Sequence, residues 1–155
     1  MKILSVKSFF EKVNFSEALL MKCYYKEKQQ KFVLEAILVN FSLPKSHREF
    51  HKLVFKNIND YKLEKGANKL FSLDPFSYKT LDYSGHICIY TMKLIDLDKI
   101  EIYLGSSHGC FEFTFDSLFH SKRIGLGKSY TNEITKYFDV KTGEEFDFYN
   151  PFLPE

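Results

Sequence analysis

The sequence of 155 residues has no Trp, three Cys and four Pro, and it contains no long hydrophobic run. Because a membrane-spanning helix needs roughly 18 consecutive apolar residues or more, this lack argues against a membrane protein. The N-terminal stretch MKILSVKSFFEKVNF also lacks the apolar core and the cleavage site of a secretory signal peptide. We therefore expect a cytoplasmic protein with no membrane partner.

The three cysteines, Cys23, Cys88 and Cys110, are odd in number and far apart in the sequence. A disulfide framework in a secreted chain uses an even number of cysteines at short spacings, so this pattern does not fit one. Each cysteine lies among apolar or aromatic residues. We expect buried free thiols in a reducing compartment.

Aromatic residues are abundant in spite of the missing Trp, since the chain has 17 Phe and 10 Tyr. Both types favour strands and bury a large area, which indicates a β-rich core. A chain of this length normally forms one domain around one core, so we interpret residues 1–155 as a single domain. The predicted fold is α+β, dominated by antiparallel β-sheet, with about six to eight strands and one or two short N-terminal helices.

The clearest local pattern is KIEIYLGSSHGCFEFTFD, residues 99–116. Apolar and polar residues alternate on both sides of GSSHG, and the glycines at the two ends of this loop permit positive φ. The stretch predicts a β-hairpin with one buried and one solvated face. The segments 18–25 and 32–41, joined by the polar KEKQQK, predict a second hairpin.

The remaining segments give further expectations. Residues 5–13 predict a short helix, with Ser5 or Ser8 as its N-cap. The segments 48–65, 86–97 and 118–125 each predict one strand, and 132–140 predicts either a strand or a short helix. Residues 67–85 are expected to connect elements and to pack on the core, and DVKTGE predicts a turn.

The stretch KRIGLGKSYT ends like a phosphate-binding loop, with Gly127, Lys128 and Ser129 in the last three positions of that motif. Such a loop needs a first glycine five residues before Gly127, where the sequence has Lys122. The backbone of the motif must wrap a phosphate, which requires this spacing. We therefore do not predict a nucleotide site here.

Two short stretches contain residue types found in catalytic sites. In SHREFH, His47 and His51 are four residues apart, as in helical zinc sites, but Arg48 stands where a metalloprotease has its Glu. We interpret both histidines as solvated loop residues. In SSHGC, His108 and Cys110 could act as base and nucleophile, but hairpin loops use the same small polar residues. The sequence predicts no catalytic residues, no metal site and no cofactor.

Charge is distributed unevenly along the chain. Residues 1–65 hold 13 Lys and Arg against 7 Asp and Glu (13 − 7 = +6), and residues 66–155 hold 9 against 13 (9 − 13 = −4). The chain ends in TGEEFDFYNPFLPE, where acids that could steer a basic partner alternate with aromatic anchors. The alternative is an edge strand with buried phenylalanines and solvated acids. The predicted partner-binding residues are Glu144, Glu145, Asp147, Phe148 and Tyr149.

A second hypothesis rests on MKCYYKEKQQKF, in which tyrosines could stack on bases and lysines could contact phosphates. The tyrosines are Tyr24 and Tyr25, and the lysines are Lys22, Lys26, Lys28 and Lys31. The net charge of +2 is small for a nucleic-acid-binding protein, and the stretch also fits an ordinary polar hairpin. Binding of nucleic acid or of a small molecule by a curved sheet is therefore our alternative function.

In order and length the layout resembles the small cytoplasmic immunity proteins of bacterial polymorphic toxin systems. The matching parts are an opening helix, the hairpin YYKEKQQKFVLEAILVNF, a strand like LVFKNINDYKL and a late hairpin like IEIYLGSSHGCFEFTF. The resemblance implies no catalysis, no cofactor and a tight complex with a toxin domain, and it assigns no residue a role. We accordingly expect a non-enzymatic protein that sequesters a partner protein.

Overall fold

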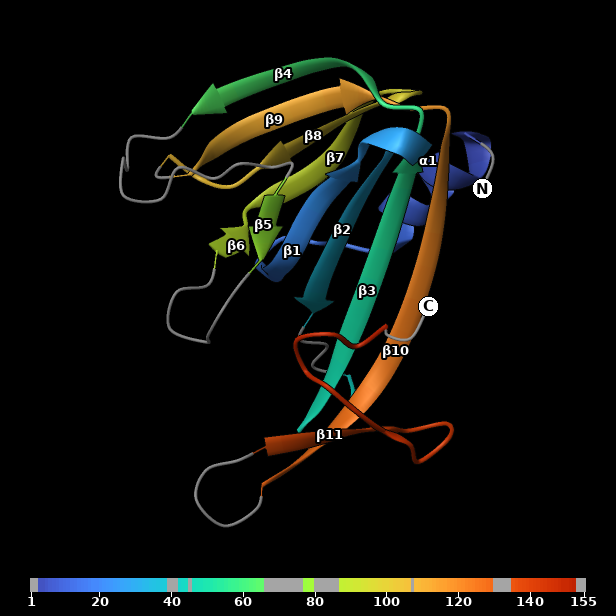
Figure 1. Ribbon diagram of the computed structural model, residues 1–155, viewed down its shortest axis with the longest axis vertical. Helices are drawn as coiled ribbons and strands as arrows, with labels where there is room; N and C mark the ends of the chain where they lie inside the picture. Colours follow the sequence, from blue (N-terminus) through green and yellow to red (C-terminus); the bar gives the residue numbers. More distant parts are fainter. Residues whose placement is uncertain are drawn as a thin grey trace.

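The computed structural model describes residues 3–38, 42–44, 46–65, 77–79, 87–106, 108–129 and 135–152. Its strands form two antiparallel sheets (Figure 1). Sheet A has eight strands, in the order β12-β11-β10-β3-β2-β1-β5 with β6 also paired to β1, and sheet B has four, in the order β4-β9-β8-β7. One helix, α1 (Ile3–Lys12), comes before them in the described chain. The predicted α+β fold dominated by antiparallel sheet is confirmed.

Strand lengths differ widely within the two sheets. Sheet A consists of β1 (Ala18–Lys26), β2 (Lys31–Leu38), β3 (His47–Lys56), β5 (Ser77–Lys79), β6 (Ile87–Ile89), β10 (Ser117–Ser129), β11 (Thr135–Asp139) and β12 (Glu145–Phe146). Sheet B consists of β4 (Asn59–Lys65), β7 (Thr91–Asp96), β8 (Lys99–Tyr103) and β9 (Gly109–Thr114). The described residues hold more strands than the six to eight expected. Two predicted strands are each divided between the sheets, and β5 and β12 are too short to leave a periodic pattern in the sequence.

Helix α1 packs on the core through the residues that its spacing predicts. Phe9 and Phe10 of the helix, and Val13 immediately after its last residue, pack against the main hydrophobic core between the two sheets. Ser5 and Ser8 lie inside the helix, so both predicted N-caps are wrong. Within the part of the chain that the structure describes, no helix has the length and apolar character needed to cross a membrane.

Both predicted hairpins are present. Strands β8 and β9 pair with Ile102 opposite Phe111, and the loop between them has positive φ at Gly105 and Gly109. Strands β1 and β2 are joined by the 3-10 turn η1 (Glu27–Gln29), after which Gln30 takes a left-handed conformation. Each hairpin is a local structure, which explains why alternation within a short window was enough to find it.

Two of the predicted single strands are each divided between the sheets. After β3, Asn57 adopts a positive φ of 55° and the chain enters sheet B as β4. Tyr90 is the single residue between β6 of sheet A and β7 of sheet B. Apolar residues on both sides of each crossing pack against the same core, although the buried positions shift by one residue at Tyr90, from Ile87 and Ile89 to Met92. The segment 132–140 contains a strand, β11, and residues 67–85 lie outside the described residues except for β5.

The main core lies between the two sheets and is rich in phenylalanine. Phe32 and Phe55 project from sheet A, and Phe111 and Phe113 project from sheet B. The ring centroids of Phe32 and Phe113, and those of Phe55 and Phe113, are 5.2 Å apart. Tilted and edge-to-face contacts add to the stabilisation that comes from buried area. We call the side of sheet A that meets this core the inner face and the opposite side the outer face.

A second, smaller apolar cluster lies on the outer face of sheet A. We call it the outer cluster; its buried members are Met21, Ile37, Phe50, Tyr137 and Phe146. The C-terminal segment, residues 139–152, crosses in front of β3 and β10 in Figure 1 and adds Phe148, Tyr149 and Phe152 to the cluster. The end of the chain is therefore a packed part of the fold.

Gly125 makes room for this segment on β10. A Cβ atom at this position would lie 2.5 Å from Cζ of Phe146 and 3.0 Å from Cε2 of Phe50. Both rings are buried, so neither can move aside without disturbing its neighbours. The strand expected over 118–125 passes through this glycine and continues to Ser129.

Candidate functional site

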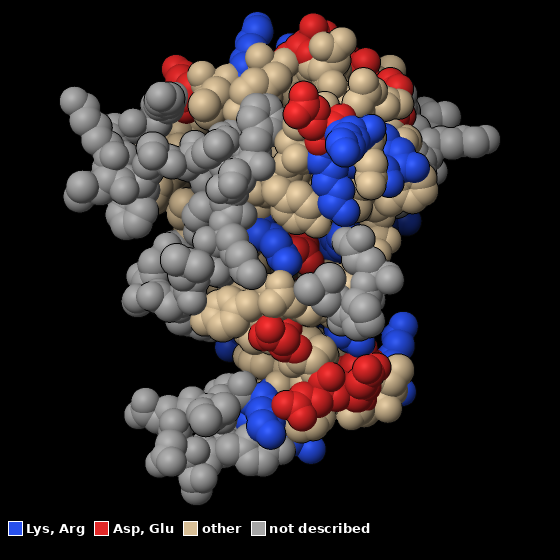
Figure 2. Space-filling model, in the orientation of Figure 1, with Lys and Arg blue, Asp and Glu red and all other residues tan. Residues whose placement is uncertain are grey.

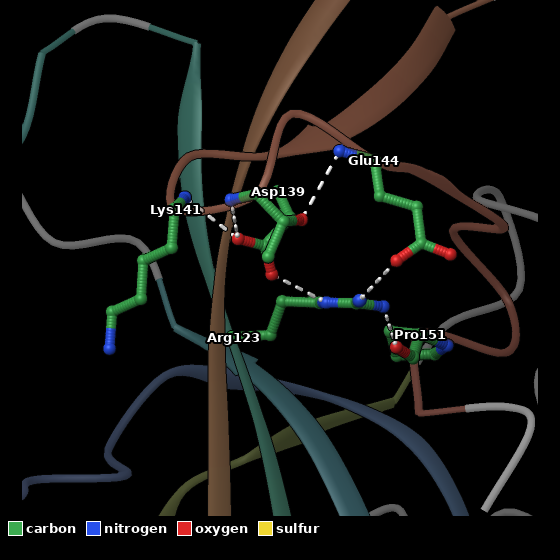
Figure 3. Close-up of polar contacts among 6 residues, drawn as sticks. Arg123, Asp139, Lys141, Glu144 and Pro151 are labelled. Atoms are coloured by element: carbon green, nitrogen blue, oxygen red, sulfur yellow. Dashed lines mark hydrogen bonds and ion pairs between the residues drawn. The ribbon is translucent and has the colours of Figure 1, made fainter.

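Arg123 of β10 attaches the C-terminal segment to sheet A (Figure 3). Its Nε donates to Oδ2 of Asp139 at 2.8 Å, and its Nη1 donates to the carbonyl oxygen of Pro151 at 2.5 Å. Its Nη2 lies 4.0 Å from Oε2 of Glu144, and its Cζ lies 4.5 Å from the ring centroid of Phe146. One guanidinium group thus contacts both ends of the segment, and charge-assisted hydrogen bonds of this kind are among the stronger ones in proteins.

Asp139 closes the turn that follows β11. Its Oδ1 accepts hydrogen bonds from the backbone N–H groups of Lys141 and Thr142, at 2.7 and 3.1 Å. Burial acts to raise the pKa of Asp139, but these bonds and the Arg123 side chain outweigh it and lower the pKa below its ordinary value. Gly143, with a φ of 75°, completes the turn that DVKTGE predicts.

The three acids predicted to bind a partner lie on the surface of the C-terminal segment. The side chains of Glu144 and Glu145 are 71% and 52% exposed. Asp147 is also exposed, and its Oδ1 accepts a hydrogen bond from the backbone N–H of Tyr149 at 3.0 Å. We call Glu144, Glu145 and Asp147 the acidic surface. Figure 2 shows acidic side chains gathered at the lower end of this view, over the C-terminal segment.

The two predicted aromatic anchors are half-buried. The ring centroid of Phe148 lies 5.9 Å from that of Phe50 and 5.3 Å from that of Tyr137. Phe148 and Tyr149 contact each other edge to face at 5.0 Å. Because these rings pack on the outer cluster, the acids are the groups of this segment that a partner would meet first.

Lys22 connects the predicted basic hairpin to the C-terminal segment. Its Nζ lies 3.0 Å from Oε2 of Glu35 and donates to Oδ1 of Asn150 at 3.1 Å. The Lys22 and Glu35 side chains are only 14% and 4% exposed. Breaking a buried pair by removing one partner leaves an uncompensated charge, so Lys22 is needed by the fold. Tyr25 packs against the main core, which separates it from Tyr24 on the other face of the strand.

A chain of three polar side chains lies on the inner face of sheet A, and sequence reasoning missed it. Nε2 of His120 lies 2.8 Å from Nδ1 of His51, and Nε2 of His51 lies 3.2 Å from Oε1 of Glu49. Because an ionised carboxylate can only accept, His51 donates through Nε2. In the neutral ring Nδ1 is then the acceptor, so the hydrogen bonds run from His120 through His51 to Glu49.

Aromatic rings enclose this histidine network. Phe15 contacts His51 edge to face at 5.3 Å, and Phe9 of α1 lies 4.6 Å from His120, both measured between ring centroids. Burial, together with the neighbouring His120, lowers the pKa of His51 to about 4. Burial and Lys122 also lower the pKa of His120. Both imidazoles are therefore mainly neutral at pH 7.

The interpretation of His47 and His51 as solvated loop histidines is wrong. Both belong to β3, and His51 is 1% exposed. Glu49 and His51 lie on the same face of β3 as the buried Leu53 and Phe55, because alternate residues of a strand point the same way. Two polar residues at the alternate positions of REFHKLVF that lead to the core were therefore a visible sign of this network. Within the described residues, no three His, Cys, Asp or Glu side chains are placed to hold a metal ion.

The structure argues against an activated Cys110. Burial, with the carboxylates of Glu101 and Glu64, raises the pKa of the Cys110 thiol to about 11. A nucleophilic cysteine needs the opposite shift, because the thiolate is the reactive form. All three cysteines are free, as expected, but Cys88 is exposed, so the expectation of burial is wrong there.

The residues that resemble a phosphate-binding loop lie in a strand. Gly127 and Lys128 belong to β10, and Gly127 donates its backbone N–H to the carbonyl oxygen of Ser46 at 2.9 Å. An extended backbone paired on both sides cannot wrap a phosphate.

An open hollow between α1 and β7, lined by residues such as Phe10, Met92 and Leu97, is a separate concavity away from the histidine network.

Comparison with known proteins gave no match to a family model, to a curated protein or to a solved structure.

Proposed function

We propose that this protein is a non-enzymatic binding protein of the immunity type, which sequesters a partner protein such as a toxin domain. The binding site in this proposal is the acidic surface. The observation that supports it most is the attachment of the C-terminal segment, which presents Glu144, Glu145 and Asp147 from a backbone held at both ends by Arg123. A partner would meet carboxylates whose backbone is already ordered, and preorganisation lowers the entropic cost of binding.

The chemistry of the acidic surface defines the partner. Three exposed carboxylates lie within four positions. Glu144 lies 4.0 Å from Nη2 of Arg123 and Glu145 lies 3.8 Å from Nζ of Lys136, but the three acids outnumber these two cations and can attract a surface rich in Lys and Arg. Such complementarity raises the rate of association and disfavours partners of the wrong charge. We expect the affinity for the partner to fall as the salt concentration rises.

The proposal is tested by a pull-down from the native host with a variant that reverses this field. The variant is Glu144→Lys, Glu145→Lys and Asp147→Asn; the asparagine keeps an oxygen that can accept from the Tyr149 backbone. The matched control is Glu64→Lys with Asp98→Lys, since both acids are exposed and lie on or beside sheet B. Proteins retained are identified by mass spectrometry.

We expect one stoichiometric protein with the unmodified chain and with the control, and loss of this protein with the charge-reversed variant. A partner retained equally by all three proteins would refute binding through the acidic surface. Co-purification of nucleic acid or a metabolite, with no stoichiometric protein, would refute sequestration of a protein partner.

A further inference from the structure

The strand register arranges the outer face of sheet A in rows near η1. In the order β1, β2, β3, β10, the first row holds Lys26, Lys31, Lys56 and Ser117. The second row holds Tyr24, Val33, Val54 and Phe119. The third row holds Lys22, Glu35, Lys52 and Ser121. An aromatic and aliphatic row thus lies between two rows that contain lysines.

Period-two geometry shows that these rows belong to the outer face. Ile37 and Phe50 are members of the outer cluster, and they are paired with each other across β2 and β3. Alternate residues of a strand point to the same side of a sheet. Glu35 and Val33 of β2, and the residues paired with them, therefore share this side with the outer cluster.

The aromatic residues of the second row are accessible and have lysines beside them. Phe119 is 47% exposed, although it lies within a long strand of the sheet. Nζ of Lys56 lies 4.2 Å from the ring centroid of Phe119, and Nζ of Lys26 lies 5.8 Å from that of Tyr24. We call the set Tyr24, Phe119, Lys26, Lys31, Lys52 and Lys56 the basic aromatic patch.

We propose that the basic aromatic patch binds single-stranded nucleic acid, with bases stacked on Tyr24 and Phe119 and phosphates held by the flanking lysines. Sheet surfaces that combine aromatic rings with basic side chains bind single strands in this way. The two rings stand three strands apart, roughly 14 Å from the spacing of paired strands, which suits a site of a few nucleotides. A duplex hides the faces of its bases and could not use the rings.

The charge around the patch favours a polyanion, because the four lysines of the patch outnumber the acids near it. Of these acids, Glu35 forms an ion pair with Lys22, and Glu27 is an exposed residue of η1. Figure 2 shows Lys and Arg side chains gathered at the upper right of the view, at the opposite end from the acidic surface. The net charge of +2, which argued against nucleic acid, is a sum over the whole chain and therefore does not reveal the local group of four lysines in the patch. Since the patch and the acidic surface are separate, this proposal does not depend on the protein partner.

The test is a titration of fluorescein-labelled dodecamers of dT and of rU, followed by fluorescence anisotropy at several salt concentrations. Phe119→Ala should weaken binding roughly tenfold, because each base stacked on an aromatic ring contributes substantially to affinity. The affinity falls as salt rises, so the plot of log affinity against log salt has a negative slope. Lys31→Gln with Lys56→Gln should make this slope shallower by about 1.4, or about 0.7 for each lost phosphate contact. Circular dichroism verifies that the variants remain folded.

A matched control exists on β10 and β11, where Nζ of Lys128 lies 5.0 Å from the ring centroid of Phe138. The variants Phe138→Ala and Lys128→Gln remove the same chemistry outside the patch and should leave affinity and salt slope unchanged. Three results would each overturn the proposal. They are no binding at low salt, binding of a duplex as tightly as the single strands, and binding of poly-glutamate of equal charge with no effect of Phe119→Ala.

Discussion

The two faces of sheet A are covered in different ways. The inner face packs against sheet B and α1 through apolar contacts between phenylalanine rings and aliphatic side chains. The outer face is covered at one end by the C-terminal segment, which depends on a few polar contacts of Arg123 and Lys22 as well as on apolar packing. Strand β2 serves both faces, since Phe32 and Leu34 point to the main core and Ile37 to the outer cluster.

This difference suggests a division of roles. The inner face stabilises the fold through burial that is distributed over many residues, whereas the outer face carries both candidate binding surfaces. The inner face also contains the histidine network, whose Glu49 lies 3.4 Å from Nζ of Lys122, and this network makes the stability of the fold sensitive to pH. Substitutions on the two faces should therefore differ in size and in the property that they change.

The largest expected effect is on the inner face. Phe113→Ala removes a ring that contacts Phe32, Phe55 and Phe111, so we expect a loss of about 3–5 kcal/mol in the free energy of unfolding. Phe148→Ala removes a half-buried ring that packs on the outer cluster and should cost about 1–2 kcal/mol. Urea denaturation followed by circular dichroism measures both. If Phe148→Ala lowered the free energy of unfolding as much as Phe113→Ala or more, the inner face would not be the main source of stability.

Gly125→Ala tests how tightly the C-terminal segment packs. The added Cβ must displace the Phe146 or Phe50 ring, and we expect a loss of about 1–3 kcal/mol from overpacking. Gly143→Ala is not an adequate control, because the positive φ of Gly143 strains any larger residue. Gly125→Ala combined with Phe146→Leu should recover part of the loss, and no recovery would show that the clash is not the cause.

The histidine network predicts how stability depends on pH. The pKa of His51 falls from 6.5 to about 4 on folding, so the unfolded chain binds the proton more readily than the folded chain between these values. The contribution of neutral His51 is present above about pH 6.5 and is lost as the pH falls toward 4. Between pH 7 and pH 5 we expect a loss of about 2 kcal/mol in the free energy of unfolding.

His51→Gln should remove this part of the pH dependence, and His47→Gln, on the same strand, should keep it. Urea denaturation at pH 7 and pH 5 gives the difference for each protein. If His51→Gln and the unmodified chain lose the same free energy between the two pH values, the network is not the cause.

The smallest expected effect on global stability comes from Arg123. Arg123→Ala removes the contacts with Asp139 and Pro151, and hydrogen–deuterium exchange should become faster in residues 140–150 while the global stability falls by about 1 kcal/mol. Arg48→Ala is the matched control, since Nη1 of Arg48 donates to the adjacent His47 carbonyl. Unchanged exchange in 140–150 would show that apolar packing alone holds the segment.

The sequence was informative where structure is local. Both hairpins and the opening helix follow from alternation or helical spacing within a few residues. Three other features depend on contacts between residues far apart in the sequence, which periodicity does not encode. They are the pairing of β3 with β10, the crossings at Asn57 and Tyr90, and the packing of the C-terminal segment over Phe50. Among the candidate sites, Glu49 and His51 had a visible signal, whereas His120 and Phe119 could be assigned to a network or a patch only once the register was known.

The pairing of β3 with β10 also has a consequence for the order of events during folding. This ladder joins Lys56 to Ser117 and His47 to Leu126. The backbone groups on this edge of β3 therefore remain unpaired until a strand from the last third of the chain has formed. Pairing between such distant segments is slow, because loop closure must come before its contacts form. On the ribosome β1, β2 and β3 emerge well before β10, and until β10 follows they can form a three-stranded meander whose β3 edge is unpaired. We expect this intermediate to be the form most prone to aggregation and the one on which a chaperone would act.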